Sequence, residues 1–197
     1  MPKVNRSGKS STLTPQQQEL LKKNLNRKMA LLADVMWYSA GRVSEVAALR
    51  ARNINFHEST LVFEKSYTKT KQTRDVPIPH HLCKELKKWI EENSIPMDGF
   101  IFFSQSSPQR KTMPGEKPIT RQAVDKAFRH AFDYIGISGA SLHYARRSYL
   151  THLHQSGLSL RECQEVSRHS SLSSLQQYLD ADRQAVFSKV RALFPIQ

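Results

Sequence analysis

The feature that most constrains the fold is a change of residue pattern at Ser59, within a chain otherwise patterned for helices. Residues 60–63 and 76–78 are short, largely apolar segments of the kind that form strands. Between them, residues 65–74 are polar and rich in Lys and Thr. This arrangement predicts a β-hairpin with a basic tip. We therefore expect an α+β domain that is mostly helical, with a small antiparallel sheet near its middle.

Helix signals flank the hairpin on both sides. Thr14 and Pro15 fit the N-cap and first position of a helix, and one apolar pattern then continues to Val35. A second helix is expected after Gly41, and Ser159 with Glu162 has the spacing of a capping box. The remaining helices are expected over residues 81–92, 120–136, 143–155, 159 onward, and from about 173 to the C-terminus.

The length and charge suggest one domain that binds a polyanion. A chain of 197 residues fits a single domain of ordinary size. Residues 1–12 contain little apolar surface and are expected to form a flexible basic arm, leaving 13–197 as the folded unit. The 30 Lys and Arg residues against 17 Asp and Glu give a net charge of +13, which favours nucleic acid as partner.

Other classes of protein fit the composition poorly. Only Cys83 and Cys163 are present, and their spacing suggests neither a disulfide framework nor a zinc site. The longest apolar runs are too short for a membrane span, and the basic N-terminus lacks the apolar segment of a secretory signal. We expect no membrane partner, no zinc site and a reducing, intracellular setting.

The first candidate cluster is Arg42 with Glu45, behind Gly41. A guanidinium near a helix N-terminus can bind a phosphate through two parallel hydrogen bonds. Glu45 lies on the same helical face and can hold the arginine in place. The alternative interpretation is an exposed salt bridge of little consequence.

The second cluster is His143 with Arg146, three residues apart and so expected on one face of a helix. A guanidinium can neutralise a phosphate oxygen while an imidazole moves a proton. Arg147 points elsewhere and is expected to contact backbone or solvent. A basic amphipathic helix is the alternative interpretation.

The third cluster is His169 followed nine residues later by Tyr178. A tyrosine, with a pKa of about 10, becomes a nucleophile only where cationic neighbours stabilise the phenolate. Taken alone, Tyr178 fits a packing role in a core or interface just as well.

Together, the three clusters and the hairpin resemble the tyrosine site-specific recombinases of the phage integrase family. That family has an arginine in Gly-x-Arg-x-Ser-Glu, a lysine on a hairpin ending in Arg-x-Val-Pro-Leu, then His-x-x-Arg, a second histidine and a tyrosine. The matching positions here are Arg42, Lys69, His143, Arg146, His169 and Tyr178. Lys71, two residues from Lys69, is the alternative hairpin lysine.

The chain departs from the family pattern in three places. Before the first arginine, Gly41, itself preceded by Ala40, stands where a bulky apolar residue is usual. Ala145 stands in place of Leu before Arg146, and Arg168 in place of Gly before His169. These departures concern the fine geometry of the site rather than the resemblance itself.

The resemblance implies the recombinase catalytic-domain fold and a DNA cleavage and rejoining reaction that needs no metal and no cofactor such as ATP. Tyr178 would be the nucleophile and form a 3′-phosphotyrosyl link, while Arg42 and Arg146 would bind the phosphate oxygens. Lys69 would protonate the leaving 5′ oxygen, and His143 and His169 would assist.

The resemblance also bears on partners and on organisation. The partner would be double-stranded DNA, bound by a tetramer in a prokaryotic cell, phage or plasmid setting. A tail helix over about 183–197 would pack on its own domain or on a neighbouring protomer. The family's N-terminal DNA-clamping domain has no counterpart in 197 residues, as expected for an excised catalytic domain or a short natural member such as the fimbrial-switch recombinases.

Three other functions remain open from the sequence. One is a type IB topoisomerase or telomere resolvase, which would use the same chemistry as a recombinase. Another is a non-catalytic protein that bends or marks DNA and has the recombinase fold without the activity. The third is a basic helical domain whose match to the recombinase motifs is accidental.

Overall fold

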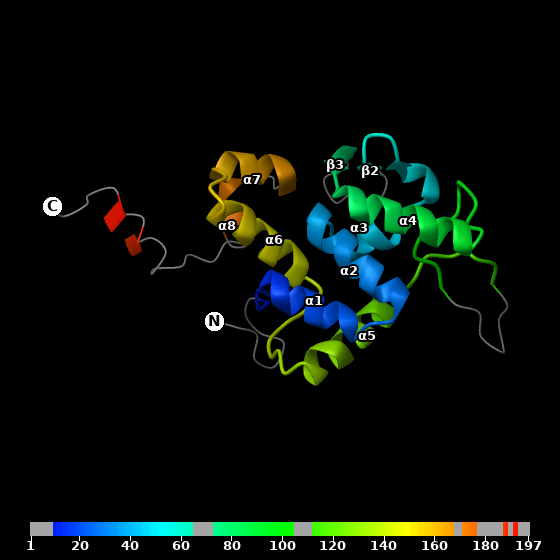
Figure 1. Cartoon of the computed structure of the whole chain (residues 1–197), viewed down its shortest axis with the longest axis horizontal. Helices are drawn as coiled ribbons and strands as arrows, with labels where there is room; N and C mark the ends of the chain where they lie inside the picture. The colour runs from blue at the N-terminus through cyan, green and yellow to red at the C-terminus, as the bar shows by residue number, and fades with distance from the viewer. Residues whose placement is uncertain are drawn as a thin grey trace.

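The computed structural model describes residues 10–64, 73–104, 112–167, 171–176, 187–188 and 191–192. Within these residues the chain forms eight α-helices, one 3₁₀-helix and three strands (Figure 1). In chain order they are α1 (Pro15–Lys23), α2 (Arg27–Ser39), α3 (Val43–Ala47), η1 (Ala51–Asn53), β1 (Ile54–Asn55), β2 (Thr60–Phe63), β3 (Arg74–Pro77), α4 (His80–Glu92), α5 (Arg121–Tyr134), α6 (Tyr144–Gln155), α7 (Leu160–Ser167) and α8 (Leu172–Gln176). The expected α+β class, mostly helical with a small antiparallel sheet, is confirmed.

Helix α2 lies at the centre of the fold. Figure 1 shows α6, α7 and α8 on one side of it, and the sheet with α4 on the other. The largest apolar cluster includes Leu32 and Met36 of α2, Leu61 of β2 and Phe128 of α5. A smaller cluster packs α6, α7 and α8 together through Leu150, Cys163 and Leu175, with Ala40 at the end of α2. The two sides of the molecule thus meet around the C-terminal end of α2.

The three strands form one antiparallel sheet in the order β1-β2-β3. Phe63 pairs with Arg74, and Thr60 pairs with Pro77, so β2 and β3 form the expected hairpin strands. Its tip, residues 65–72, lies outside the described residues. Strand β1 was not predicted, because two residues carry no detectable alternation.

The single apolar pattern that was expected to form one helix up to Val35 is divided into α1 and α2. Asn24 caps the end of α1, and the side chain of Asn26 accepts a hydrogen bond from Met29 N at 3.0 Å to begin α2. Asparagine side chains at these positions satisfy the backbone groups that a helix end leaves exposed. The expectation of one helix was therefore wrong. Most of its apolar residues face the core, but Leu20 is 45% exposed.

Helix signals elsewhere in the sequence match the structure. The side chains of Thr14 and Thr120 cap α1 and α5, and Ser159 and Glu162 form the expected reciprocal pair. No helix within the described residues is long and apolar enough to cross a membrane.

The segment before α1 is attached to the loop that leads into α6. Ser11 N donates to Gly139 O at 3.0 Å, and Ser141 N donates to Ser10 Oγ at 2.9 Å. Leu13 N donates to Ser148 Oγ at 2.8 Å. Of the arm expected over residues 1–12, Ser10 and Ser11 are therefore fixed, and residues 1–9 lie outside the described residues.

Tyr144, at the start of α6, anchors this helix to α1. The side chain is fully buried, and its hydroxyl donates to Gln18 Oε1 at 2.9 Å. It packs against Phe128 and Phe132 of α5. Burial raises the pKa of Tyr144 well above its usual value of about 10.

Tyr144→Phe is expected to lower the free energy of unfolding by about 1–2 kcal/mol near neutral pH, because Gln18 Oε1 loses its donor. In the unfolded chain Tyr144 ionises near pH 10, whereas in the folded state it stays protonated, so its contribution is lost as pH rises above about 10. Urea unfolding at neutral pH and above pH 10 measures both effects. The variant should lose less stability between these two conditions than the wild type, while Tyr134→Phe, at an 81% exposed position, should match the wild type. An equal loss in Tyr144→Phe and wild type would contradict this account.

Candidate active site

Arg42 is held at the start of α3 by Glu45. Glu45 accepts from Arg42 N and from Arg42 Nη1, each at 2.9 Å. The Glu45 side chain is 3% exposed and that of Arg42 is 25% exposed. The pair is therefore a partly buried, charge-assisted contact with a fixed geometry, and the alternative of a solvated surface salt bridge does not fit.

The residues before Arg42 make an unusual turn. Ala40 adopts a left-handed conformation with φ of 49° at the end of α2, a position that glycine usually occupies. A Cβ atom on Gly41 would lie 2.7 Å from Val46 Cγ2 and 2.8 Å from Ser39 Oγ. The space directly before Arg42 thus has no room for the bulky residue usual in the family.

Arg146 is buried in α6, with 1% of its surface exposed. Its Nη1 donates to Ala40 O and its Nη2 donates to Ser167 O, both at 2.6 Å. Arg146 therefore joins the C-terminal end of α2 to that of α7. Backbone carbonyls at helix ends lack partners within the helix and carry partial negative charge, so a guanidinium is well suited to this place.

His143 and Arg146 differ in their surroundings. His143 occupies the N-cap position of α6 and is exposed, whereas Arg146 points into the protein. Arg147, which was expected to contact backbone or solvent, is only 5% exposed, so a position in solvent is excluded. The sequence pattern could not reveal this burial, because it depends on the packing of α6 against helices from elsewhere in the chain, among them α2 and α7.

Arg74 is a further charged residue at this place, and it was not among the predicted site residues. It begins β3, is 6% exposed and points to the same side of the sheet as the buried Val76. Its Nη2 lies 3.5 Å from Glu45 Oε2, so Glu45 contacts two guanidiniums. The sequence did carry a signal, because Arg74 occupies an inward position in the alternation of β3.

The described contacts thus bring Arg42, Arg74 and Arg146 together around the ends of α2 and α7, with Glu45 as the carboxylate that pairs with two of them. Such a cluster can bind an anion and stabilise negative charge that builds up during a reaction. In the described parts of the chain, no group of three His, Cys, Asp or Glu side chains is arranged to hold a metal.

Lys69, the alternative Lys71, His169 and Tyr178 lie outside the described residues. Their roles stay predictions. The described residues that flank them are placed: Phe63 and Arg74 pair at the base of the hairpin segment, and Ser167, whose carbonyl Arg146 binds, comes two residues before His169.

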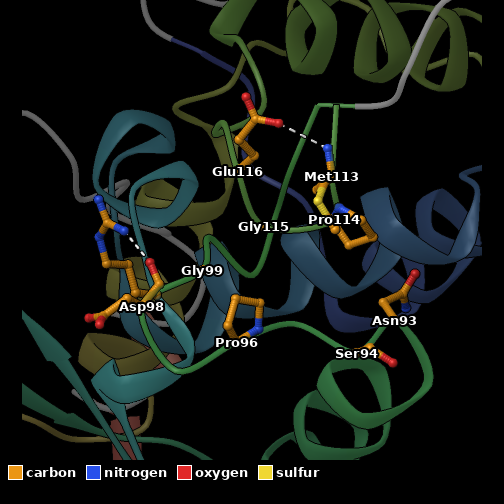
Figure 2. Close-up of a pocket in the computed structure, with 10 residues that line it drawn as sticks. Asn93, Ser94, Pro96, Asp98, Gly99, Met113, Pro114, Gly115 and Glu116 are labelled. Carbon is orange, nitrogen blue, oxygen red and sulfur yellow. Dashed lines mark hydrogen bonds between the residues drawn. The ribbon is translucent and has the colours of Figure 1, made fainter. Parts of the chain in front are cut away.

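A separate hollow lies between the end of α4 and the segment around Gly115. This cavity has a volume of about 500 Å³. Figure 2 shows Pro96, Gly99, Met113 and Pro114 among its lining residues. Met113 N donates to Glu116 Oε2 at its rim, at 3.0 Å. None of the predicted site residues lines it, so we place the candidate active site at the arginine cluster instead.

Comparison with known proteins identifies the family. The sequence profile of the phage integrase family matches residues 11–185. A tyrosine recombinase of Pseudothermotoga lettingae is 26% identical over 98% of this chain and 63% of its own length. Tyrosine recombinase XerC of Halalkalibacterium halodurans is 27% identical over 75% of this chain and 48% of its own length. Tyrosine recombinase XerA of Pyrococcus furiosus is 30% identical over 73% of this chain and 47% of its own length.

Solved structures share the fold. The crystal structure of XerA recombinase has a TM-score of 0.76 at 18% identity, covering 97% of this chain and 68% of that one. XerH bound to a palindromic difH substrate in a post-cleavage complex has a TM-score of 0.72 at 18% identity, covering 95% and 55%. The Tn1549 transposon integrase with a circular intermediate DNA has a TM-score of 0.72 at 14% identity, covering 94% and 67%.

The fold is shared with solved structures of tyrosine recombinases, and the profile match extends over most of the chain. The chain belongs to the phage integrase family, which confirms the resemblance drawn from its motifs. It spans between about half and two thirds of the length of these curated relatives.

Proposed function

We propose that this chain is the catalytic domain of a site-specific tyrosine recombinase, which cleaves and rejoins DNA through a covalent bond to Tyr178. The observation that carries the proposal is the guanidinium cluster of Arg42 and Arg146 at the meeting point of α2, α3, α6 and α7. Support comes from relatives named as tyrosine recombinases and from neighbours in fold that were solved on DNA.

The proposed reaction exchanges one phosphodiester for another. The phenolic oxygen of Tyr178 attacks the scissile phosphorus, and the bond from phosphorus to the 5′ oxygen breaks. Lys69 gives a proton to this leaving oxygen, and His143 and His169 hydrogen-bond the phosphate or move the phenolic proton. The reverse reaction with the 5′ hydroxyl of another strand releases Tyr178, so the bond energy is conserved in the phosphotyrosine.

Arg42 and Arg146 would stabilise the negative charge on the phosphate oxygens in the transition state. Arg146 would do so from its place between α2 and α7, where it binds Ala40 O and Ser167 O. The positive charge that many nucleases take from a metal ion would come here from guanidiniums.

Covalent capture of DNA tests this function. The protein is mixed, in the presence of a chelator, with labelled random-sequence duplexes that carry a nick, and the mixture is then denatured. A nick near the cleavage site lets the short 5′-hydroxyl fragment diffuse away, so the covalent complex accumulates. We expect a protein–DNA band that resists denaturation and concentrates a particular sequence over repeated rounds.

Other outcomes of the same assay separate the alternatives. DNA binding without any covalent band would favour a non-catalytic DNA-bending or marking protein on the same scaffold. A covalent band without enrichment of a sequence, together with relaxation of supercoiled plasmid, would favour a type IB topoisomerase.

We also propose that the protein acts as a homotetramer on DNA, inside a bacterial or archaeal cell or on a mobile element carried there. The apolar residues of the tail, around Val186 and Val190, would join neighbouring protomers. Truncation after Asp182 should then weaken assembly on the captured duplex while single-site binding persists. Unchanged assembly would contradict the role of the tail.

A further inference from the structure

Arg74 makes contacts to four separate parts of the molecule from a buried position. Its Nη1 donates to Ser39 O and to Val166 O, each at 3.3 Å, and its Nη2 pairs with Glu45 at 3.5 Å. Its guanidinium carbon lies 4.4 Å from the centre of the Phe63 ring, across the hairpin. We propose that Arg74 is a positioning residue, which fixes the base of the hairpin carrying Lys69 against the ends of α2 and α7.

Arg74 and Arg146 bridge the same two helix ends. Arg74 takes the carbonyls of Ser39 and Val166, and Arg146 takes the carbonyls of the residues that follow each of them. Two helix C-termini that approach each other bring together partial negative charges and carbonyls without helical partners. The two guanidiniums supply both the positive charge and the hydrogen-bond donors that these helix ends lack. The difference is that Arg74 arrives from the hairpin, so it links that hairpin to the junction.

The contacts of Arg74 require a guanidinium. Its planar group donates in several directions at once and also lies against the Phe63 ring, whereas a lysine offers a single nitrogen. Glu45 supplies the compensating charge that a buried cation needs. Its contacts with Ser39 O, Val166 O, Glu45 and the Phe63 ring place Arg74 to hold neighbouring elements together. Arg74→Lys is therefore a selective test of its position.

The consequence concerns Lys69, which precedes Arg74 by five residues in the same hairpin segment. This step rests on the proposed function, in which Lys69 protonates the 5′ oxygen as it leaves. If the base of the hairpin shifts, the rate of proton transfer from Lys69 to that oxygen should fall more than the rate of any other step. The attack of Tyr178 on phosphorus needs no proton from the hairpin.

A sulfur atom in place of the bridging 5′ oxygen separates these effects. Cleavage then breaks a phosphorus–sulfur bond, and the thiol, with a pKa near the 8.5 typical of cysteine, leaves as thiolate without a proton. On the captured duplex with oxygen, Arg74→Lys should form the covalent complex at least about tenfold more slowly, which is part of the 10²–10⁴-fold that a general acid contributes. On the sulfur duplex its rate should return to within about threefold of wild type.

The ratio of the sulfur rate to the oxygen rate is the decisive quantity, because both rates are measured on the same preparation. Partial misfolding would lower both rates together and so could not raise this ratio. A ratio in Arg74→Lys equal to that of wild type would overturn the proposal. Lys69→Ala should show the same raised ratio, and Arg52→Lys, an exposed arginine on η1, should keep the wild-type ratio. A raised ratio in Lys69→Ala but not in Arg74→Lys would overturn this inference while the proposed function stands. No cleavage by wild type on either duplex would overturn both.

Phe63→Leu provides a milder second variant should Arg74→Lys fail to fold. It removes the ring beside the guanidinium and leaves every polar partner of Arg74 in place. We expect a smaller rise of the same ratio, about threefold, given the modest strength of cation–π contacts. A ratio equal to that of wild type in this variant would contradict the role given to the hairpin base.

Discussion

Arg146→Ala is expected to lower the free energy of unfolding by about 2–5 kcal/mol and to abolish covalent capture of DNA. The stability loss follows because Ala40 O and Ser167 O, both in a buried region, lose their donor, and each buried group left without a partner costs about 1–3 kcal/mol. The loss of capture follows from the proposed contact with the scissile phosphate. Urea denaturation and the capture assay measure the two effects separately.

Two matched variants sharpen this prediction. Arg146→Lys keeps the charge, but one ammonium cannot replace two guanidinium nitrogens that bind carbonyls of different helices, so its loss should be intermediate. Arg121→Ala, at the exposed start of α5, should stay within about 0.5 kcal/mol of wild type. An Arg146→Ala protein as stable as wild type would show that the bridge between α2 and α7 contributes nothing.

Glu45→Ala is expected to have a comparable effect, about 3–5 kcal/mol, because it removes the carboxylate that pairs with both Arg42 and Arg74. Arg74 would remain as a buried cation without this partner. Glu45→Gln keeps the shape and an acceptor oxygen for Arg42 while losing the charge, so it should fall between Glu45→Ala and wild type.

A double-mutant cycle tests whether the effect arises from this ion pair. If the Glu45 and Arg74 charges stabilise each other, the double variant Glu45→Ala, Arg74→Ala should lose less stability than the sum of the single variants. Unfolding free energies that simply add would show that the two residues act independently, and would argue against the shared network at the active site.

Features set by neighbours in the sequence could be predicted. The caps at Thr14 and Thr120 and the pairing of Arg42 with Glu45 depend on residues three apart, so the local pattern was enough. The hairpin strands were recognisable because apolar strand residues flank a polar segment. The motif order of Arg42, His143 and Arg146 indicated the family, which the profile match then confirmed.

Features set by distant parts of the chain could not be predicted. The depth of Arg146 and Arg147 depends on how α6 packs against neighbouring helices, and the contacts of Arg74 join β3 to helices 35 and 92 residues away. The attachment of Ser11 to Gly139 likewise depends on tertiary structure alone. The break between α1 and α2 is a different case. Asn24 and Asn26 are local capping signals in the sequence, but the apolar pattern that continues across them favoured a single helix.

The central claim is that Tyr178 carries the covalent bond to DNA, and identification of the linked residue tests it most directly. The captured complex is digested with nuclease and protease, and the peptide that bears a nucleotide is sequenced by mass spectrometry. We predict a 3′-phosphonucleotide on Tyr178, and no covalent complex from Tyr178→Phe, whereas Tyr134→Phe, altered at an exposed tyrosine on α5, reacts like wild type. A nucleotide on any other residue, or a covalent complex that survives in Tyr178→Phe, would contradict the proposed mechanism.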